Sequence, residues 1–298
     1  MKRHLKLLSC LFAPATLWAA ETSGPRLESP VLGYVFDQAA QSIRTADGIP
    51  GAASLGEAVE FSTSLASAHV HSGARLALGV TKEGQVVLAS WAAGNRLSAL
   101  ETELDAPGQV AFSHSGGHVA FSGGAVLEVW STGTSPARLR RFEAEGALTG
   151  LAVNDAGEVA ALLSSGRIVR FREEEESFAA GADWSALAYT SDGSAVIAAD
   201  GLRGELVRLS ADGGRSVLAS VTGRVSVIEG EYALTASGLA WFSSGGATVP
   251  VACDCRPQGL DRLNGAVHIR GTSLVVDAEG NELRLTALPN LFPNGVNQ

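Results

Sequence analysis

Residues 110–121 read Val-Ala-Phe-Ser-His-Ser-Gly-Gly-His-Val-Ala-Phe, and they carry the clearest local signal in the sequence. Two apolar runs flank a short polar segment that contains Gly116. Glycine readily adopts the positive φ that a tight hairpin needs, and small polar residues beside it cap the turn through their side chains. The stretch therefore predicts two antiparallel strands joined by a tight turn.

Three further segments have the same form, namely residues 68–79, 151–162 and 187–198. The turn glycines of the four segments are Gly73, Gly116, Gly157 and Gly193, which gives spacings of 43, 41 and 36 residues. A repeat of about 40 residues is typical of one blade of a β-propeller, in which each blade is a four-stranded antiparallel sheet.

The second half of each repeat supports this interpretation. Glycines 124, 166 and 204 are each followed by an alternating apolar and polar run, at residues 126–131, 167–172 and 205–210. Such alternation predicts a third strand in each unit. Residues 97–104 are the best helical candidate in the chain, and they fit a strand followed by a linker equally well.

The turn units resemble the F-S-P-D-G-x-x-[LIV]-A hairpins of WD40-like, YVTN-type and TolB-type bacterial propellers. The strand Val126-Leu127-Glu128-Val129-Trp130-Ser131 is similar to the strand that ends a WD40 repeat. The resemblance covers residues 67–214 well and the flanks weakly. The family proline is missing from all four turns, and Ser131 stands where WD40 repeats place Asp, which favours the looser bacterial class.

The flanking sequence supplies further units at residues 33–56, 224–251 and 259–288. The fold class is therefore all-β, a β-propeller of about seven blades over residues 33–288, with six or eight also possible. An N-terminal strand could close the ring by pairing with the last blade, because closure leaves only short, protected sheet edges.

The first 20 residues have the layout of a secretory signal peptide. A basic start with Lys2, Arg3 and Lys6 precedes an apolar stretch and then Ala19-Ala20. We expect a signal peptide over 1–20 and a single propeller domain over 21–298, free in the periplasm or outside the cell. A lipoprotein anchor at Cys10 is the less favoured alternative, and no later segment is long and apolar enough to span a membrane.

Composition and charge limit the classes of partner. Hydrophobic residues make up 46% of the chain, which is ample for a core, and the formal charge is -9. Removal of the leader with its three basic residues would bring the charge to -12. Nucleic acid is an unsuitable partner for a protein this acidic, because affinity for nucleic acid depends on neutralising its phosphates with basic residues.

Cys253 and Cys255 are the cysteines that would remain after cleavage. An even pair in an oxidising compartment favours a disulfide, although a C-x-C bridge closes a small, strained ring. A free thiol pair and a redox or metal-binding pair stay open as alternatives.

The histidines and acidic residues give no defined catalytic or metal site. His69 and His71 form an H-x-H pair on one strand face, which could contribute two metal ligands. The repeat alignment, however, places His71 and His114 at the turn position that Asp155 and Asp192 fill in other units. His118 and His268 have no partner that the sequence identifies, and Glu173–Glu176 is expected to be a solvated loop between blades.

The function favoured by the sequence is an exported, monomeric binding scaffold for a protein or another envelope component. No nucleophile elbow, phosphate-binding loop, zinc-protease motif or dinucleotide fingerprint is present, so we assign no catalytic residue, cofactor or metal. The alternative is a propeller hydrolase or lyase with a metal-dependent site in the central channel. Asp183, Asp200 and Asp261, near predicted strand ends, are the candidates for that site. The tryptophans are expected to pack between blades, with one or two as a possible sugar platform in the channel.

Overall fold

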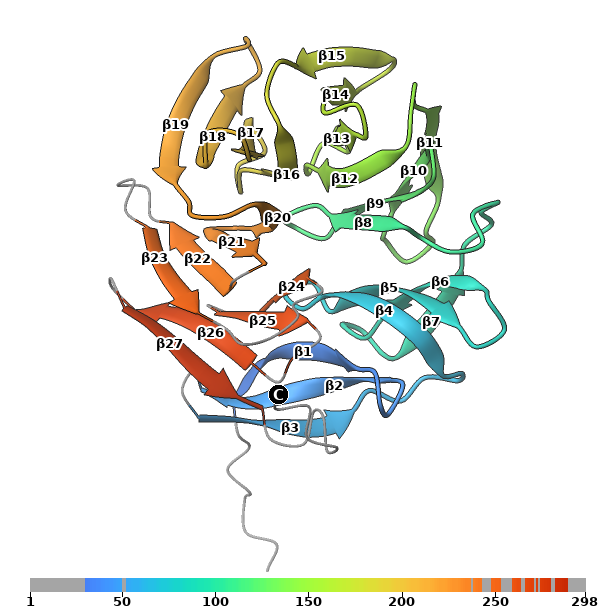
Figure 1. Cartoon of the computed structure of the whole chain (residues 1–298). Coiled ribbons are helices and arrows are strands. Elements are labelled where there is room, and N and C mark those ends of the chain that lie inside the picture. Colours follow the sequence, from blue (N-terminus) through green and yellow to red (C-terminus); the bar gives the residue numbers. More distant parts are fainter. Residues whose placement is uncertain are drawn as a thin grey trace, which may run out of the picture.

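The computed structural model describes residues 30–49, 52–236, 238–242, 248–252, 259–263, 266–270, 272, 274–279 and 282–288. These residues form strands and turns, and the strands make seven separate antiparallel sheets. Figure 1 shows the sheets placed in chain order around a common centre. The expected all-β propeller is therefore confirmed, with seven blades in the described part of the chain.

Each blade is built from consecutive strands. Blade 1 contains β1 (Val31–Asp37), β2 (Ser42–Ile49) and β3 (Ala52–Ala58). Blade 2 contains β4 (Leu65–His71), β5 (Leu76–Thr81), β6 (Val86–Ser90) and β7 (Arg96–Ala99), and blade 3 contains β8 (Gln109–Phe112), β9 (His118–Gly123), β10 (Val126–Ser131) and β11 (Arg138–Glu143). Blade 4 contains β12 (Leu148–Val153), β13 (Val159–Leu163), β14 (Ile168–Phe171) and β15 (Glu175–Ala179).

The remaining three blades follow the same plan. Blade 5 contains β16 (Trp184–Tyr189), β17 (Ala195–Asp200), β18 (Glu205–Ser210) and β19 (Arg215–Ser220). Blade 6 contains β20 (Val225–Glu229), β21 (Tyr232–Thr235), β22 (Gly238–Phe242) and β23 (Thr248–Ala252). Blade 7 contains β24 (Gly259–Arg262), β25 (Ala266–Arg270), β26 (Leu274–Glu279) and β27 (Glu282–Ala287).

The hydrophobic core is divided among the interfaces between blades. The described residues form seven buried clusters, and each cluster joins two neighbouring blades. Between blades 3 and 4, for example, Leu127 and Val129 pack with Val159 and Phe171. A blade thus buries both of its faces, which explains why β13 is apolar and buried along its whole length.

Three tryptophans pack between blades as the sequence predicts. Trp91, Trp130 and Trp184 are each at most 7% exposed and belong to three different interface clusters. The side chain of Trp241 lies outside the part of the chain whose side chains are described.

Ring closure differs from the expectation. Within the described residues β1 pairs with β2, and the sheet of blade 7 consists of β24 to β27 in sequence order. Blade 7 draws all four of its strands from one continuous segment, so its sheet is complete without an N-terminal strand. The ring is closed instead by side-chain packing, in which Leu32 and Val35 of blade 1 meet Leu263 and Val275 of blade 7.

The first repeat also needs a correction at its turn. Gly116, Gly157 and Gly193 have φ of +74°, +75° and +67°, but in blade 2 the left-handed residue is Arg75, with φ of +53°. The N–H of Arg75 donates to the carbonyl of Ser72, three residues earlier, and the three glycines make the equivalent bond. The left-handed residue of blade 2 therefore lies two residues later than the sequence alignment assumed, and Gly73 is not that residue.

Runs 126–131, 168–171 and 205–210 are third strands, which confirms their assignment, and residues 97–104 form the end of β7 and a linker. The glutamate run lies within blade 4 rather than between blades, with Glu175 and Glu176 in β15.

In the described ranges no helix is long and apolar enough to cross a membrane. Cys10, Cys253 and Cys255 lie outside the described residues.

Candidate functional site

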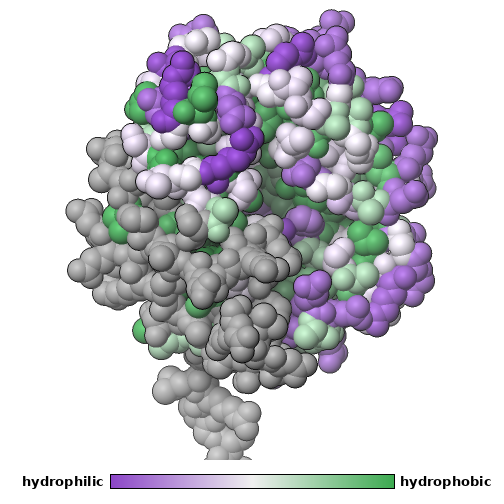
Figure 2. Space-filling view, in the orientation of Figure 1, coloured by the Kyte–Doolittle hydropathy of each residue, from purple (hydrophilic) through white to green (hydrophobic). Residues whose placement is uncertain are grey.

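A cavity of about 820 Å³ follows the centre of the ring. The first strands of six blades line it, namely β4, β8, β12, β16, β20 and β24. In Figure 2 the described surface is hollowed near the centre, and both hydrophobic and hydrophilic residues are visible in the hollow. Ionisable side chains gather around this cavity, and we call the group His69, His114, Asp155, Glu229, Arg262 and Arg270 the channel mouth.

Among the described lining residues of the cavity there is none from blade 1. Its first strand, β1, packs between the neighbouring blades. A Cβ at Gly33 would lie 2.6 Å from both Leu263 of blade 7 and Ser72 of blade 2, so a larger residue would have to displace these side chains. The N–H of Tyr34 donates to Ser72 Oγ over 2.7 Å. Because β1 is held there, β24 of blade 7 contacts β4 of blade 2 directly.

Asp261 is the centre of a buried ionic group in blade 7. Arg270 donates to Asp261 Oδ1 from Nε at 3.1 Å and from Nη2 at 2.6 Å. His268 lies with Nδ1 3.1 Å from Asp261 Oδ2 and with Nε2 2.9 Å from the carbonyl of Thr272. Burial would raise the pKa of Asp261, but the charge of Arg270 and the hydrogen bond from His268 outweigh it and hold this pKa well below its usual range.

The same arginine connects blade 7 to blade 2. Nη1 of Arg270 donates to Nδ1 of His69 over 2.9 Å. Burial, together with the charge of Arg270, lowers the pKa of His69 to about 4. His69 is therefore neutral near pH 7, and because its Nδ1 accepts, its Nε2 carries the proton.

A second arginine connects blade 7 to blade 3. Nη1 of Arg262 donates to Nδ1 of His114 over 3.0 Å. Arg262 is exposed to the cavity, and the described carboxylates do not come within ion-pair distance of it. Arg262 and Arg270 therefore link blade 7 to blades 3 and 2, across the point where the ring closes.

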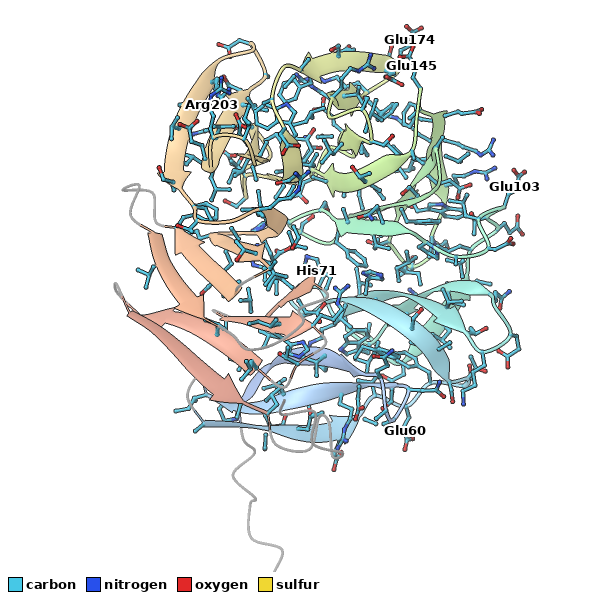
Figure 3. The ribbon with its side chains drawn as sticks, viewed as in Figure 1. Glu60, His71, Glu103, Glu145, Glu174 and Arg203 are labelled. Carbon is cyan, nitrogen blue, oxygen red and sulfur yellow. The ribbon has the colours of Figure 1, made fainter. Side chains whose placement is uncertain are left out.

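His71 stabilises its own turn rather than facing a metal. The N–H of Ala74 donates to Nδ1 of His71 over 3.1 Å, and the imidazole meets the ring of Phe112 edge-on at 5.5 Å. Burial is the main cause that lowers the pKa of His71. Figure 3 places His71 near the centre of the ring, whereas Glu103, Glu145, Glu174 and Arg203 lie at its outer edge.

Hydrogen bonds between turns make the channel mouth rigid. The N–H and Oγ–H of Ser115 in blade 3 donate to Asp155 Oδ1 of blade 4, at 2.9 and 2.7 Å. Partial burial raises the pKa of Asp155, but these bonds from Ser115 give a net lowering. One blade further, Asn154 Nδ2 donates to the carbonyl of Gly193 over 3.4 Å. The turn glycines also lie close to the preceding blade, since a Cβ on Gly157 would be 3.4 Å from the ring of His118.

Glu229 ends β20 and lines the cavity from blade 6. Burial raises the pKa of Glu229, and Asp261 acts in the same direction, whereas Arg262 and Arg270 oppose the shift. Glu229 thus lies in the field of both arginines, although it is not within ion-pair distance of either.

The three aspartates considered for a metal site do not converge. Asp183 pairs with Arg224 at 2.7 Å, Asp200 pairs with Arg203 at 2.7 Å, and Asp261 pairs with Arg270. Each carboxylate is thus neutralised by an arginine of its own. In the described ranges no group of three or more His, Cys, Asp or Glu residues could hold a metal ion.

Sequence reasoning missed Arg262, Arg270 and Glu229 and left His268 without a partner. One signal was available for His268. An Asn264-Gly265 dipeptide favours a two-residue hairpin turn, and a turn centred there places Asp261 opposite His268. The observed register has this pairing. His118, also without a predicted partner, has an Nδ1 that is buried and makes no hydrogen bond in the structure.

Comparison with solved structures identifies the fold. Virginiamycin B lyase from Staphylococcus aureus is 12% identical, with a TM-score of 0.53 over 74% of this chain and 83% of that one. PorZ, described as an essential bacterial surface component of the type-IX secretion system of Porphyromonas gingivalis, is 13% identical, with a TM-score of 0.60 over 88% of this chain and 38% of that one. The WD40 repeats of RRP9 are 15% identical, with a TM-score of 0.54 over 77% and 82%.

No family model and no curated protein matches the chain. The structural similarities, all at low identity, establish a WD40-like β-propeller fold and no activity.

Proposed function

We propose that the chain is an exported β-propeller that works as a binding scaffold and receives a protein or another envelope component at the channel mouth. The observation that carries this proposal is the construction of the mouth. Its ionisable groups come from five blades, and hydrogen bonds between blades fix several of them in place. A preorganised rim of this kind lowers the ordering cost of binding.

Export is the second part of the proposal and is supported by the N-terminal sequence alone. The basic start, short apolar stretch and Ala19-Ala20 are typical of a cleaved leader. A mature protein recovered from the periplasm or the medium should begin at Ala20 or Glu21. Recovery of the chain from the cytoplasm with an intact N-terminus would refute this part.

Site-specific photo-cross-linking in the producing cell tests the binding role. A photoreactive amino acid replaces Ser191, which is exposed in the β16–β17 turn and lines the cavity. The matched control replaces Ser216, exposed on the outer strand β19 of the same blade. We expect a discrete adduct from position 191 and none from position 216. Equal labelling from both positions, or no adduct from position 191, would refute a partner at the mouth.

A further inference from the structure

Arg262 is a guanidinium at the channel mouth that lacks an acidic partner among the described residues. It follows Asp261 on β24, and successive strand residues point to opposite faces, so Asp261 takes Arg270 while Arg262 is exposed in the cavity. Of its five N–H donors, the structure occupies one, on His114. The remaining donors of Arg262 are available to a ligand.

Two imidazoles add further donors in the same cavity, and one of them, His114, contacts Arg262. His69 and His114 each accept a hydrogen bond from an arginine at Nδ1, so in the neutral ring the proton is on Nε2. Both residues line the cavity. In the described part of the chain, Nε2 of neither ring has a hydrogen-bond partner. The side of the mouth formed by blades 2, 3 and 7 therefore presents several donors.

Two carboxylates of the same region already accept hydrogen bonds. Asp261 accepts from Arg270 and His268, and Asp155 accepts twice from Ser115. A ligand that brings acceptors, and negative charge in particular, would complete the hydrogen bonds of Arg262.

We infer that the channel mouth binds an oxyanion, a carboxylate or phosphate group carried by the ligand, with Arg262 as its principal donor and the Nε2–H groups of His69 and His114 beside it. The inference rests on the proposed function in placing the ligand at the mouth, and it names the chemistry that the ligand presents there. Glu229 lines the same cavity, and its carboxylate competes with the ligand's oxyanion for the positive charge of Arg262. Burial favours its neutral form, which weakens that competition.

Thermal unfolding and calorimetric titration of the full chain with inorganic phosphate and with succinate, at constant ionic strength, test the inference. Phosphate at about 100 times its Kd should raise the melting temperature by roughly 5 °C for a domain of this size. The two anions separate the two sources of the group, since a phosphate-bearing and a carboxylate-bearing ligand would favour different probes. A shift with either anion supports the inference if it depends on Arg262.

Four variants test whether anion binding depends on Arg262. Arg262→Gln should weaken Kd by about tenfold or more, and Arg262→Lys should recover part of the loss, because it keeps the charge but not the planar fork. Glu229→Gln removes the competing charge and should tighten binding. Arg140→Gln, on the exposed outer strand β11, changes the net charge equally and should bind as the unmodified protein does.

The inference is overturned if neither anion shifts the unmodified protein, or if all variants respond equally, as they would to a general salt effect. A melting temperature of Arg262→Gln close to that of the unmodified protein without anion shows that the variant is folded. Loss of anion binding with the cross-link from position 191 retained would contradict only this inference. Anion binding without any cross-link would contradict the scaffold function and leave the anion site standing.

Discussion

Nδ1 of His69 in blade 2 lies 2.9 Å from Nη1 of Arg270 in blade 7, so these two blades are joined directly although blade 1 separates them in the ring order. The two residues are 201 positions apart in the sequence. With β1 set back between them, this bond and the Arg262–His114 bond supply polar contacts at the closure, where hydrophobic packing joins blades 7 and 1.

The first prediction concerns pH. The folded protein lowers the pKa of His69 to about 4, from 6.5 in the unfolded chain. The unfolded state therefore binds the proton more readily, and His69 contributes stability above pH 6.5 that is lost as the pH falls toward 4. Replacing His69 with Gln should make the urea midpoint less sensitive to pH in this interval. The same pH dependence in both proteins would show that His69 is not responsible.

The second prediction concerns the buried carboxylate of Asp261. Asp261→Asn leaves Arg270 and His268 without their anion and should cost about 3–5 kcal/mol of unfolding free energy. The control is Asp183→Asn, since Asp183 and its partner Arg224 have side chains that are 46% and 63% exposed. Exposed pairs contribute about 0–1 kcal/mol. Equal losses in denaturant unfolding would contradict the assigned role of Asp261.

The third prediction compares two glycines with similar backbone and different surroundings. Gly116 has φ of +74° and Gly124 has φ of +66°. A Cβ at Gly116 would overlap Cβ of Ala74 in blade 2, whereas a Cβ at Gly124 would meet nothing within 4 Å. Gly124→Ala should cost only the backbone strain, about 1–2 kcal/mol, and Gly116→Ala should cost about 1–3 kcal/mol more. Equal costs would mean that the turn does not need close contact with blade 2.

The fourth prediction concerns Glu128, a fully buried charge in β10. Its carboxylate accepts from Trp130 Nε1 at 2.9 Å and from Arg138 Nη1 at 3.2 Å. Glu128→Ala leaves the buried indole N–H unpaired and should cost about 1–3 kcal/mol, while Glu128→Gln keeps an acceptor and should cost less. The ranking can be measured by thermal unfolding, and equal losses would show that the carboxylate charge, which both variants remove, matters more than an acceptor for the indole.

The sequence predicts those features that depend on local chemistry. The β8–β9 turn is recognisable because Gly116 combines a positive φ with flanking apolar strands, and the same pattern locates most blades. Blade 2 shows where this fails. Its left-handed residue is Arg75, and no residue-type signal distinguishes that position from Gly73 two residues earlier.

The channel mouth is less predictable because its contacts join distant blades. The Asp261–His268 pair follows from hairpin register and could be inferred from the Asn264-Gly265 dipeptide in the sequence. The bond from Arg262 to His114 spans 148 residues and depends on how the ring closes. That closure rests on packing around Gly33, which the sequence shows only as one glycine among 35.

The most direct test of this account measures whether free anions compete with the partner. Cross-linking from position 191 is repeated with increasing phosphate or succinate at constant ionic strength. The experiment is done with Arg262 unchanged and with the Arg262→Gln substitution. We predict that the adduct decreases as the effective anion increases, and that Arg262→Gln forms little adduct at any concentration. An adduct of constant yield in both proteins would contradict the claim that the partner binds at the channel mouth through an oxyanion on Arg262.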